Sequence, residues 1–262
     1  MNILKHELKM NFKTLLIWLL SVGGLCFGCV LLYGSLKDSL AELSDAYSSM
    51  GNFSVAFGMD RLDLSTLTGF YATEIGVMFS LGGAMYAAIL GSSMLSKEES
   101  GHTAEFLFTM PCSRASVISQ KLLAMLINIA IFHLFCIGAF ACGFVIMGEQ
   151  IPVEKFLLYH LMQFLMQFEI ASVCFLLSSL GKKSHTGSAL GITIILYCID
   201  MMCRIIPAIK NLKYITPFYY SNGSDIFSTG KVTILATLIG LGITILGILS
   251  SFIIYEKRDL AA

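Results

Sequence analysis

Residues 231–254 read KVTILATLIGLGITILGILSSFII, and Lys231 is the single charged residue in this stretch. About 20 mostly apolar residues are enough for a helix to cross the ~30 Å hydrocarbon core of a bilayer. The stretch therefore predicts a membrane-spanning helix, and the rest of the chain repeats the pattern.

Five more runs of this character occur, at about 15–34, 71–95, 122–147, 156–180 and 186–206. The composition agrees, because 56% of the 262 residues are hydrophobic and 13% are charged, against roughly 25% charged in a soluble domain. We expect an all-α integral membrane protein with six transmembrane helices in a single domain, residues 1–262. The longest connections, near 35–70 and 96–121, leave no room for a nucleotide-binding domain.

Charge and cysteine content exclude other classes. A composition this apolar argues against a water-soluble enzyme, and 17 basic residues balanced by 17 acidic ones argue against a nucleic-acid binder. Cys26 and Cys29 have CxxC spacing, but no second pair of matching spacing accompanies them. We therefore expect neither a metal site nor a disulfide framework. The first apolar run lacks a small-residue cleavage site, so we expect it to be retained as a helix.

The distribution of Lys and Arg predicts the orientation. Six crossings place both termini on one side, with ten Lys and Arg residues there and six on the other side. Positive residues favour the cytoplasm, so we expect cytoplasmic termini and an outward-facing segment 35–70. Residues 2–14, NILKHELKMNFKT, are either a helix in the cytoplasmic interface or the positive flank of the first crossing.

The connection 96–121 reads SKEESGHTAEFLFTMPCSRASVISQK. Ser96 and Glu99 have the spacing of a capping box, which predicts a helix start, and Pro111 ends that helix. Ser113 is placed to cap a second helix that leads into the third crossing. The apolar residues beside the acids suggest docking onto another protein or onto the membrane surface.

The same connection carries a recognisable pattern, KEE-x-G-x-T-x-EFL-x-x-x-P-x-SR. It consists of Lys97, Glu98, Glu99, Gly101, Thr103, Glu105, Phe106, Leu107, Pro111, Ser113 and Arg114, and Lys121 follows. It resembles the first cytoplasmic loop of type-2 ATP-binding-cassette (ABC) transporter permeases. The ending Tyr255–Leu260 also resembles theirs, whereas His102 departs from their usual Gly-Thr pair.

The resemblance implies a permease subunit of an ATP-driven exporter in a bacterial cytoplasmic membrane. Two ATPase subunits, which hold ATP and Mg²⁺, would work with this chain and with a second copy or a similar permease. Residues about 97–110 would be the coupling helix that rests on the ATPase. The chain itself would be non-catalytic and hold no cofactor. Gly181-Lys182-Lys183-Ser184 is superficially close to the end of a phosphate-binding loop, but such a loop needs a second glycine five positions earlier, where this chain has Leu176.

Polar residues within the predicted helices are candidates for function. On 156–180, Gln163 and Gln167 lie within about 60° of His160, and Glu169 lies about 180° away. This helix is therefore expected between other helices, along a cavity or at a subunit interface. Gln163, Gln167 and Glu169 serve either as interhelical hydrogen-bonding groups or as substrate contacts.

Two further expectations concern the outer side. Asp200 and Arg204 are predicted to form an i,i+4 ion pair near the outer end of the fifth helix. Residues 207–230 are a candidate for a short outer helical hairpin.

Two alternative functions are less well supported. A secondary transporter working alone would have no use for a docking loop, and an intramembrane protease would need an arginine where Thr103 stands. The transported substrate is not specified, although the apolar walls favour an amphiphilic or peptide-like cargo.

Overall fold

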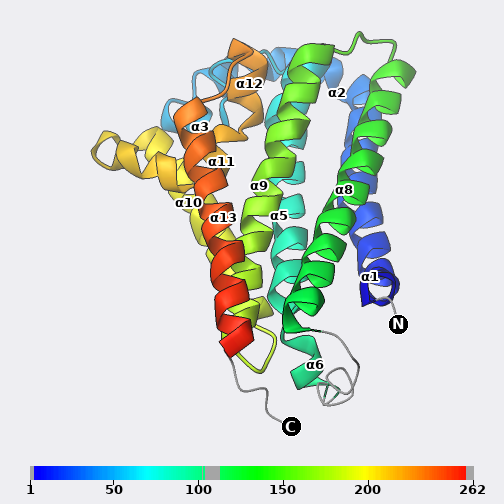
Figure 1. The fold of residues 1–262 in the computed structure, drawn as a ribbon. Coiled ribbons are helices and arrows are strands. Elements are labelled where there is room, and N and C mark those ends of the chain that lie inside the picture. Colours follow the sequence, from blue (N-terminus) through cyan, green and yellow to red (C-terminus); the bar gives the residue numbers. More distant parts are fainter. Residues whose placement is uncertain (1–2, 102, 104–112, 258–262) are drawn as a thin grey trace.

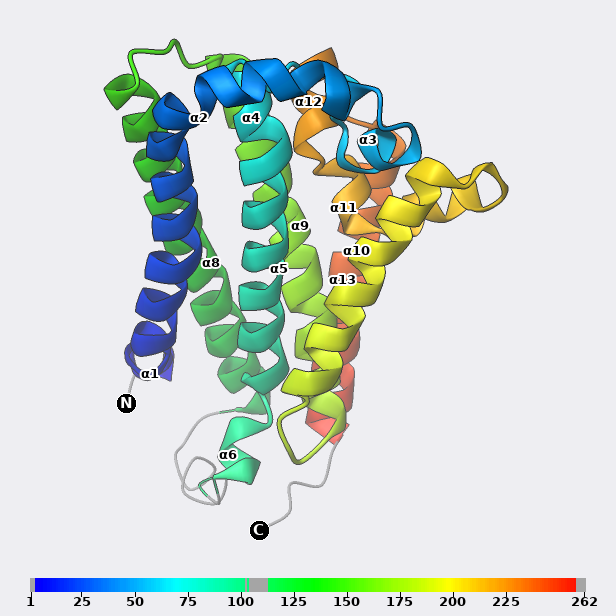
Figure 2. The same ribbon diagram turned by 180° about the vertical axis from the view of Figure 1, so that it is seen from behind.

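The computed structural model describes residues 3–101, 103 and 113–257, and within these residues the regular secondary structure is helical. Six helical stretches are long and apolar enough to cross a membrane: Ile3–Glu42, Leu67–Ser93, Arg114–Ile146, Val153–Leu180, Thr186–Ile205 and Ile234–Lys257. The prediction of an all-α protein with six membrane-spanning helices is confirmed. The bundle is seen in Figure 1 and, from behind, in Figure 2.

The first stretch is longer than the predicted helix 15–34, because the chain is helical on both sides of it. It consists of α1 (Ile3–Trp18), the π-helical turn η1 (Leu19–Gly23) and α2 (Gly24–Ser48). The N-terminal segment thus continues directly into the first span. In Figure 2, the later turns of α2 run across the end of the bundle.

Two spans form the centre of the bundle. In the spans Leu67–Ser93 and Val153–Leu180, 67% and 61% of the residues in an apolar 18-residue stretch are buried inside the protein, against 22% in Ile234–Lys257. The first contains α5 (Gly76–Ser93) and the second is α9, and these two helices pack against each other. A Cβ at Gly91 would lie 2.3 Å from the Ala171 carbonyl oxygen, so this approach requires glycine.

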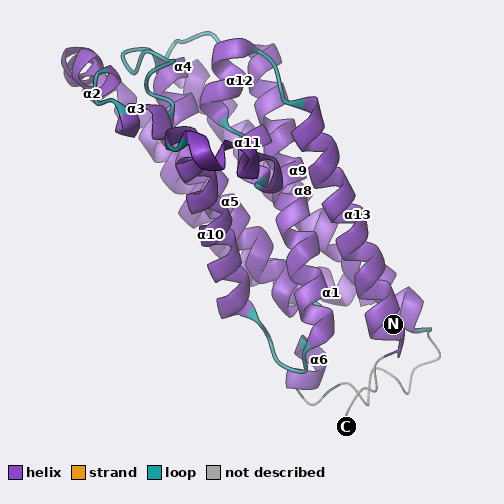
Figure 3. Ribbon diagram, turned by 90° about the vertical axis from the view of Figure 1, so that its left-hand side faces the viewer, coloured by secondary structure: helices purple, strands orange, loops and turns teal. Residues whose placement is uncertain are grey.

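The outer helices flank this centre on two sides. α1 and α2 pack against α8 (Arg114–Ile146) on one side. On the other side, α13 (Ile234–Lys257) packs against α9, and α10 (Thr186–Ile205) packs against α5. Figure 3 shows the helices of the bundle from a third direction, in which α10 and α13 are seen apart from each other.

The end opposite to the termini is built from short helices. The segment 35–70 contains the end of α2, α3 (Asn52–Phe57) and α4 (Leu67–Phe70), which leads through the π-helical turn η2 (Tyr71–Ile75) into α5. The segment 207–230 is helical, as expected, and forms the 3₁₀ helix η3 (Pro207–Ile215), α11 (Pro217–Tyr220) and α12 (Gly223–Thr229). Ser224 Oγ of α12 donates to the Phe57 carbonyl at 3.2 Å, which joins the two segments.

The start of α1, the one-turn helix α6 (Lys97–Ser100) and the last turn of α13 lie together at the other end (Figure 1). This is the arrangement that an even number of crossings produces. Lys97, the first residue of the recognised pattern, pairs here with Glu7 of the N-terminal helix.

Candidate functional site

The connection between α5 and α8 begins with α6, which ends at Gly101. The predicted capping box does not form, because the Ser96 side chain makes no capping hydrogen bond. Ser96 lies in the three-residue turn between α5 and α6, with helical rather than extended backbone angles, and its hydroxyl donates back to the Ser92 carbonyl at 3.5 Å. Of the helix predicted over 97–110, residues 102 and 104–110 lie outside the described residues.

The other predicted cap, at Ser113, is confirmed. The Ser113 backbone is extended, with φ −71° and ψ 150°, and its Oγ accepts a hydrogen bond from the Ser116 N–H at 3.2 Å. This bond satisfies a backbone donor that the first turn of a helix leaves unpaired. α8 accordingly begins at Arg114.

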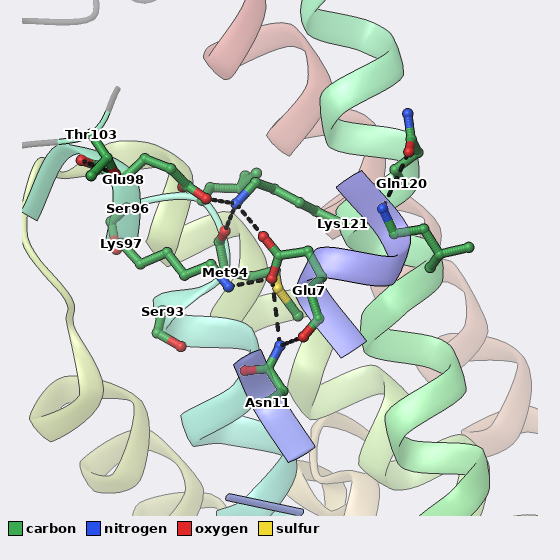
Figure 4. A network of polar contacts seen from close by, with 12 residues as sticks. Glu7, Asn11, Ser93, Met94, Ser96, Lys97, Glu98, Thr103, Gln120 and Lys121 are labelled. Atoms are coloured by element: carbon green, nitrogen blue, oxygen red, sulfur yellow. Dashed lines mark hydrogen bonds and ion pairs between the residues drawn. The ribbon is translucent and has the colours of Figure 1, made fainter. Parts of the chain in front are cut away.

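Lys121, two turns into α8, is the centre of the site. Its side chain is fully buried, and its ammonium group donates to Glu7 Oε1 at 3.0 Å and to the Met94 carbonyl at 2.7 Å. It also forms an ion pair with the Glu98 carboxylate. An ammonium group has three donors, so these three acceptors satisfy it completely (Figure 4).

Glu7 connects this cluster to the N-terminal helix. Its side chain is 1% exposed, and its second carboxylate oxygen, Oε2, forms an ion pair with Lys97. Asn11, one turn further along α1, donates to the Glu7 carbonyl at 2.9 Å. Figure 4 shows Glu7 pointing from α1 toward the ammonium groups of Lys97 and Lys121. We refer to Glu7, Lys97, Glu98 and Lys121 as the Glu7–Lys121 network.

The network has two negative and two positive side chains, so its charges balance. Removing one partner from a buried ion pair leaves an unpaired charge and costs about 3–5 kcal/mol. The ends of α1, α5 and α8 are therefore held to α6 by interactions that are expensive to break one at a time.

Further hydrogen bonds attach the same connection to the remaining helices. Ser178 Oγ of α9 accepts from the Leu95 and Ser96 N–H groups at 2.8 and 3.1 Å. Ser100 Oγ donates to the Lys182 carbonyl at 3.0 Å, in the turn between α9 and α10. Arg114 Nη1 donates to the Glu256 carbonyl at 2.9 Å, at the C-terminal end of α13, where a cation also suits the helix dipole.

A comparison with protein families matches residues 1–260 to the ABC-2 family transporter proteins. The chain belongs to this ABC-2 transporter family. The match agrees with the six spans and with the resemblance of the 96–121 connection. A comparison with curated proteins gave no match. Membrane subunits of the ABC-2 family are generally non-catalytic and normally work with an ATPase subunit.

The residues of the ABC-2 pattern fall into three groups. Lys97 and Glu98 belong to the network, and Glu99 is buried at the same turn. Gly101 ends α6, Thr103 N donates to the Glu98 carbonyl at 2.8 Å, and Ser113 and Arg114 start α8. Glu105, Phe106, Leu107 and Pro111 lie outside the described residues.

Sequence reasoning missed Glu7 and gave Lys121 no role of its own. Glu7 is the single acid among Lys5, Lys9 and Lys13, which are exposed on α1 while Glu7 is buried. A lone acid in a basic segment could have indicated a buried partner of opposite charge. Its partner, however, lies 114 residues further along the chain.

The polar residues of α9 point to two sides of this helix, as their spacing in the sequence predicted. On one side, Gln167 Oε1 lies 2.9 Å from His133 Nε2 of α8, and His160 Nε2 lies 2.9 Å from the Tyr71 hydroxyl of η2. Gln163 Nε2 donates to the Ser221 carbonyl at 2.8 Å. α9 therefore lies between other helices, and these side chains are buried within the subunit.

On the other side, Glu169 Oε2 accepts from the Tyr220 hydroxyl at 2.8 Å. A Cβ at Gly240 of α13 would lie 2.4 Å from that oxygen, so glycine makes room for the carboxylate. Glu169 also lines an apolar cavity of about 210 Å³ together with residues such as Val173 and Leu196. It is the only carboxylate among the described residues that line this cavity.

The predicted pair of Asp200 and Arg204 is confirmed, with Arg204 Nε donating to Asp200 Oδ2 at 3.0 Å. Arg204 Nη1 also donates to Asp225 Oδ2 of α12 at 3.0 Å, and Asp225 pairs with Arg61. This second charged cluster lies at the end opposite to the Glu7–Lys121 network. Among the described residues, no group of three or more His, Cys, Asp or Glu side chains could hold a metal ion.

Proposed function

We propose that the chain is the permease subunit of an ATP-driven exporter and that it moves substrate through a pathway shared with a second permease. Two separate ATPase subunits bind ATP and Mg²⁺ and dock on residues about 97–110. The observation that carries this proposal is the Glu7–Lys121 network, because it ties the start of the docking segment to α1, α5 and α8.

The network supplies a means of transmission. When the ATPase displaces α6, Glu98 and Lys97 are pulled with it, and both are paired to buried groups. Because an unpaired buried charge costs about 3–5 kcal/mol, Lys121 and Glu7 follow rather than separate. α8 and α1 then move as rigid bodies, which is a common form of conformational change in proteins.

The orientation and location belong to the same proposal. The Lys and Arg bias places the end that carries the network in the cytoplasm, where the ATPase would be. The membrane would be a bacterial cytoplasmic membrane, with the chain as a multi-pass subunit. It would bind and pass substrate without covalent chemistry.

A second permease copy, or a similar permease, would cover part of the outer surface. The Gly187–Gly191 pair of α10 forms a GxxxG pattern, which permits close helix approach. Nothing in the described residues lies within 4 Å of a Cβ built at either position. Because the described residues leave both positions uncovered, the pattern supports a contact with a helix of a neighbouring subunit.

Docking can be tested with Glu105→Ala combined with Phe106→Ala, measured as yield of the ATPase complex and as substrate-stimulated ATP hydrolysis. We expect loss of association or ATP hydrolysis that no longer drives transport, with normal membrane insertion. The control is Lys9→Ala with Phe12→Ala, a charged and an aromatic residue exposed at the same end of the bundle. Normal complex yield and normal transport in the first variant would overturn the coupling role.

Co-purification separates this proposal from a secondary transporter that works alone. The chain, tagged and extracted in mild detergent from its own membranes, should carry an ATPase with two permease chains and two ATPase chains per complex. Transport by the isolated chain in vesicles without ATP would instead favour the secondary transporter.

A further inference from the structure

We infer that the end of the bundle opposite to the Glu7–Lys121 network carries a binding site for a phosphate group, supplied by the headgroup of an anionic lipid. The site is a cavity of about 590 Å³ between the end of α10, η3, α12 and the start of α13. Five basic side chains line it: Arg61, Arg204, Lys210, Lys213 and Lys231. This inference is independent of the proposed coupling to an ATPase.

The acids near the cavity are occupied by the arginines. Asp225 pairs with Arg61 and Arg204, Asp200 pairs with Arg204, and Asp60 lies 3.6 Å from Arg61. The two arginines are therefore matched by these three carboxylates. Even so, Arg204 is 7% exposed, and its second terminal nitrogen, Nη2, is buried without an acceptor among the described residues.

The three lysines have no carboxylate partner among the described residues. Lys213 Nζ donates to the Tyr219 hydroxyl at 2.8 Å, and this hydrogen bond holds the pKa of Lys213 above its ordinary value. Lys210 and Lys231 are exposed, and the described residues offer their ammonium groups no acceptor. Three unmatched cations beside an unsatisfied arginine nitrogen favour an anion with several acceptor oxygens, which describes a phosphate.

The depth of the cavity favours a lipid as the source. α10 has 20 residues, and at 1.5 Å per residue it spans about 30 Å, the thickness of the hydrocarbon core. The residues that follow Ile205 therefore lie at the level of the headgroups. Figure 2 shows η3, in yellow, projecting sideways from the bundle at this level.

The surface of η3 suits that position. Leu212 and Ile215 are 42% and 56% exposed, and apolar side chains of this kind enter the acyl region beside a polar face. Tyr214 and Tyr219 stand next to Lys213, whose Nζ lies 5.0 and 4.6 Å from their ring centroids. Tyrosine is typical of the interface level of a membrane, so the lysines are presented where lipid phosphates are densest.

The test compares two sets of lysines in the full-length protein, reconstituted in nanodiscs of phosphatidylcholine and titrated with phosphatidylglycerol. Lys210→Gln, Lys213→Gln and Lys231→Gln together should weaken phosphatidylglycerol binding at least tenfold. The matched control, Lys5→Gln, Lys9→Gln and Lys13→Gln, removes three exposed lysines from the other end and should leave the binding at this site unchanged. Equal weakening in both variants would overturn the inference.

Two further arms identify the source of the phosphate. Millimolar inorganic phosphate should compete with phosphatidylglycerol if a phosphate group is recognised, and a failure to compete would refute the phosphate chemistry. If inorganic phosphate binds but phosphatidylglycerol does not, the lipid source is wrong. Lys210→Glu alone, at an exposed position that is safe for folding, should also weaken phosphatidylglycerol binding, and unchanged binding would count against the site.

Discussion

Replacing Lys121 by methionine tests the network most directly. The substitution keeps an unbranched side chain, shorter by one atom, and removes the ammonium group that bonds Glu7, Glu98 and the Met94 carbonyl. One-sided loss of a buried charge costs about 3–5 kcal/mol. Two features of the structure reduce the loss, because Lys97 still pairs with Glu7 and Glu98 is 14% exposed to water. We therefore expect a loss of about 3 kcal/mol, the lower end of the range.

A double-mutant cycle isolates the interaction from the loss of packing. Glu7→Gln should cost about 2 kcal/mol, because Lys121 keeps its contacts with Glu98 and the Met94 carbonyl. Combined with Lys121→Met, it should cost less than the sum of the two by at least about 1 kcal/mol, since neighbouring charges couple. Purely additive losses would mean that the two side chains do not interact in solution.

The assay is reversible denaturant unfolding of the purified chain in detergent micelles, followed by the ratio of transport to ATP hydrolysis in the assembled complex. Lys183→Met, an exposed lysine at the same end, should lie within about 0.5 kcal/mol of the unmodified chain. If Lys121→Met matched this control in stability and transported normally, the reasoning about a buried, load-transmitting network would be refuted.

Three other predictions concern the bundle and its orientation. In a cysteine-free background, Met50→Cys should be labelled from outside and Lys183→Cys from inside, and reversed labelling would contradict the topology. Gly91→Ala should destabilise the bundle by about 1–3 kcal/mol because its Cβ would meet the Ala171 carbonyl oxygen, whereas Gly138→Ala, whose Cβ meets nothing within 4 Å among the described residues, should not lower the melting temperature. Hydrogen bonds from the Ser65 hydroxyl and N–H lower the pKa of Asp63 from its ordinary 3.8. The stability this provides is present well above that value and is lost as the pH falls through the lowered pKa, so the protection of the amides at residues 63–66, relative to exchange in an unstructured chain, should fall only in strong acid.

The membrane spans could be predicted because the lipid bilayer requires apolar side chains along each of them. Each central stretch must be apolar over about 20 residues, and hydropathy reveals such stretches without knowledge of tertiary contacts. The helices extend beyond the apolar runs. Residues 3–14 and 35–48 are helical but polar, so hydropathy alone does not mark the ends of the first helix.

The site was only half predictable. Lys97, Glu98 and Arg114 were found through a pattern of neighbouring residues, but Glu7 was not, because no local pattern encodes a contact across 114 residues. Ser96 shows the opposite failure. Its spacing to Glu99 matched a capping box, yet Ser96 lies in a tight turn after α5 that keeps its backbone in helical rather than extended angles, so the local rule did not apply.

The two charged clusters differ in a way that accounts for their proposed roles. In the Glu7–Lys121 network, each charged side chain has a buried partner of opposite sign within the chain, and the balance of charges suits the proposed role of a rigid link between helices. At the other end, the arginines are matched but Lys210, Lys213 and Lys231 have no carboxylate partner among the described residues and line an open cavity. A balanced, buried cluster transmits displacement because separating it is costly. An unbalanced, accessible one attracts anions because its field is not cancelled locally. On the two proposals together, the mechanical connection and the anion-binding surface would lie at opposite ends of the bundle.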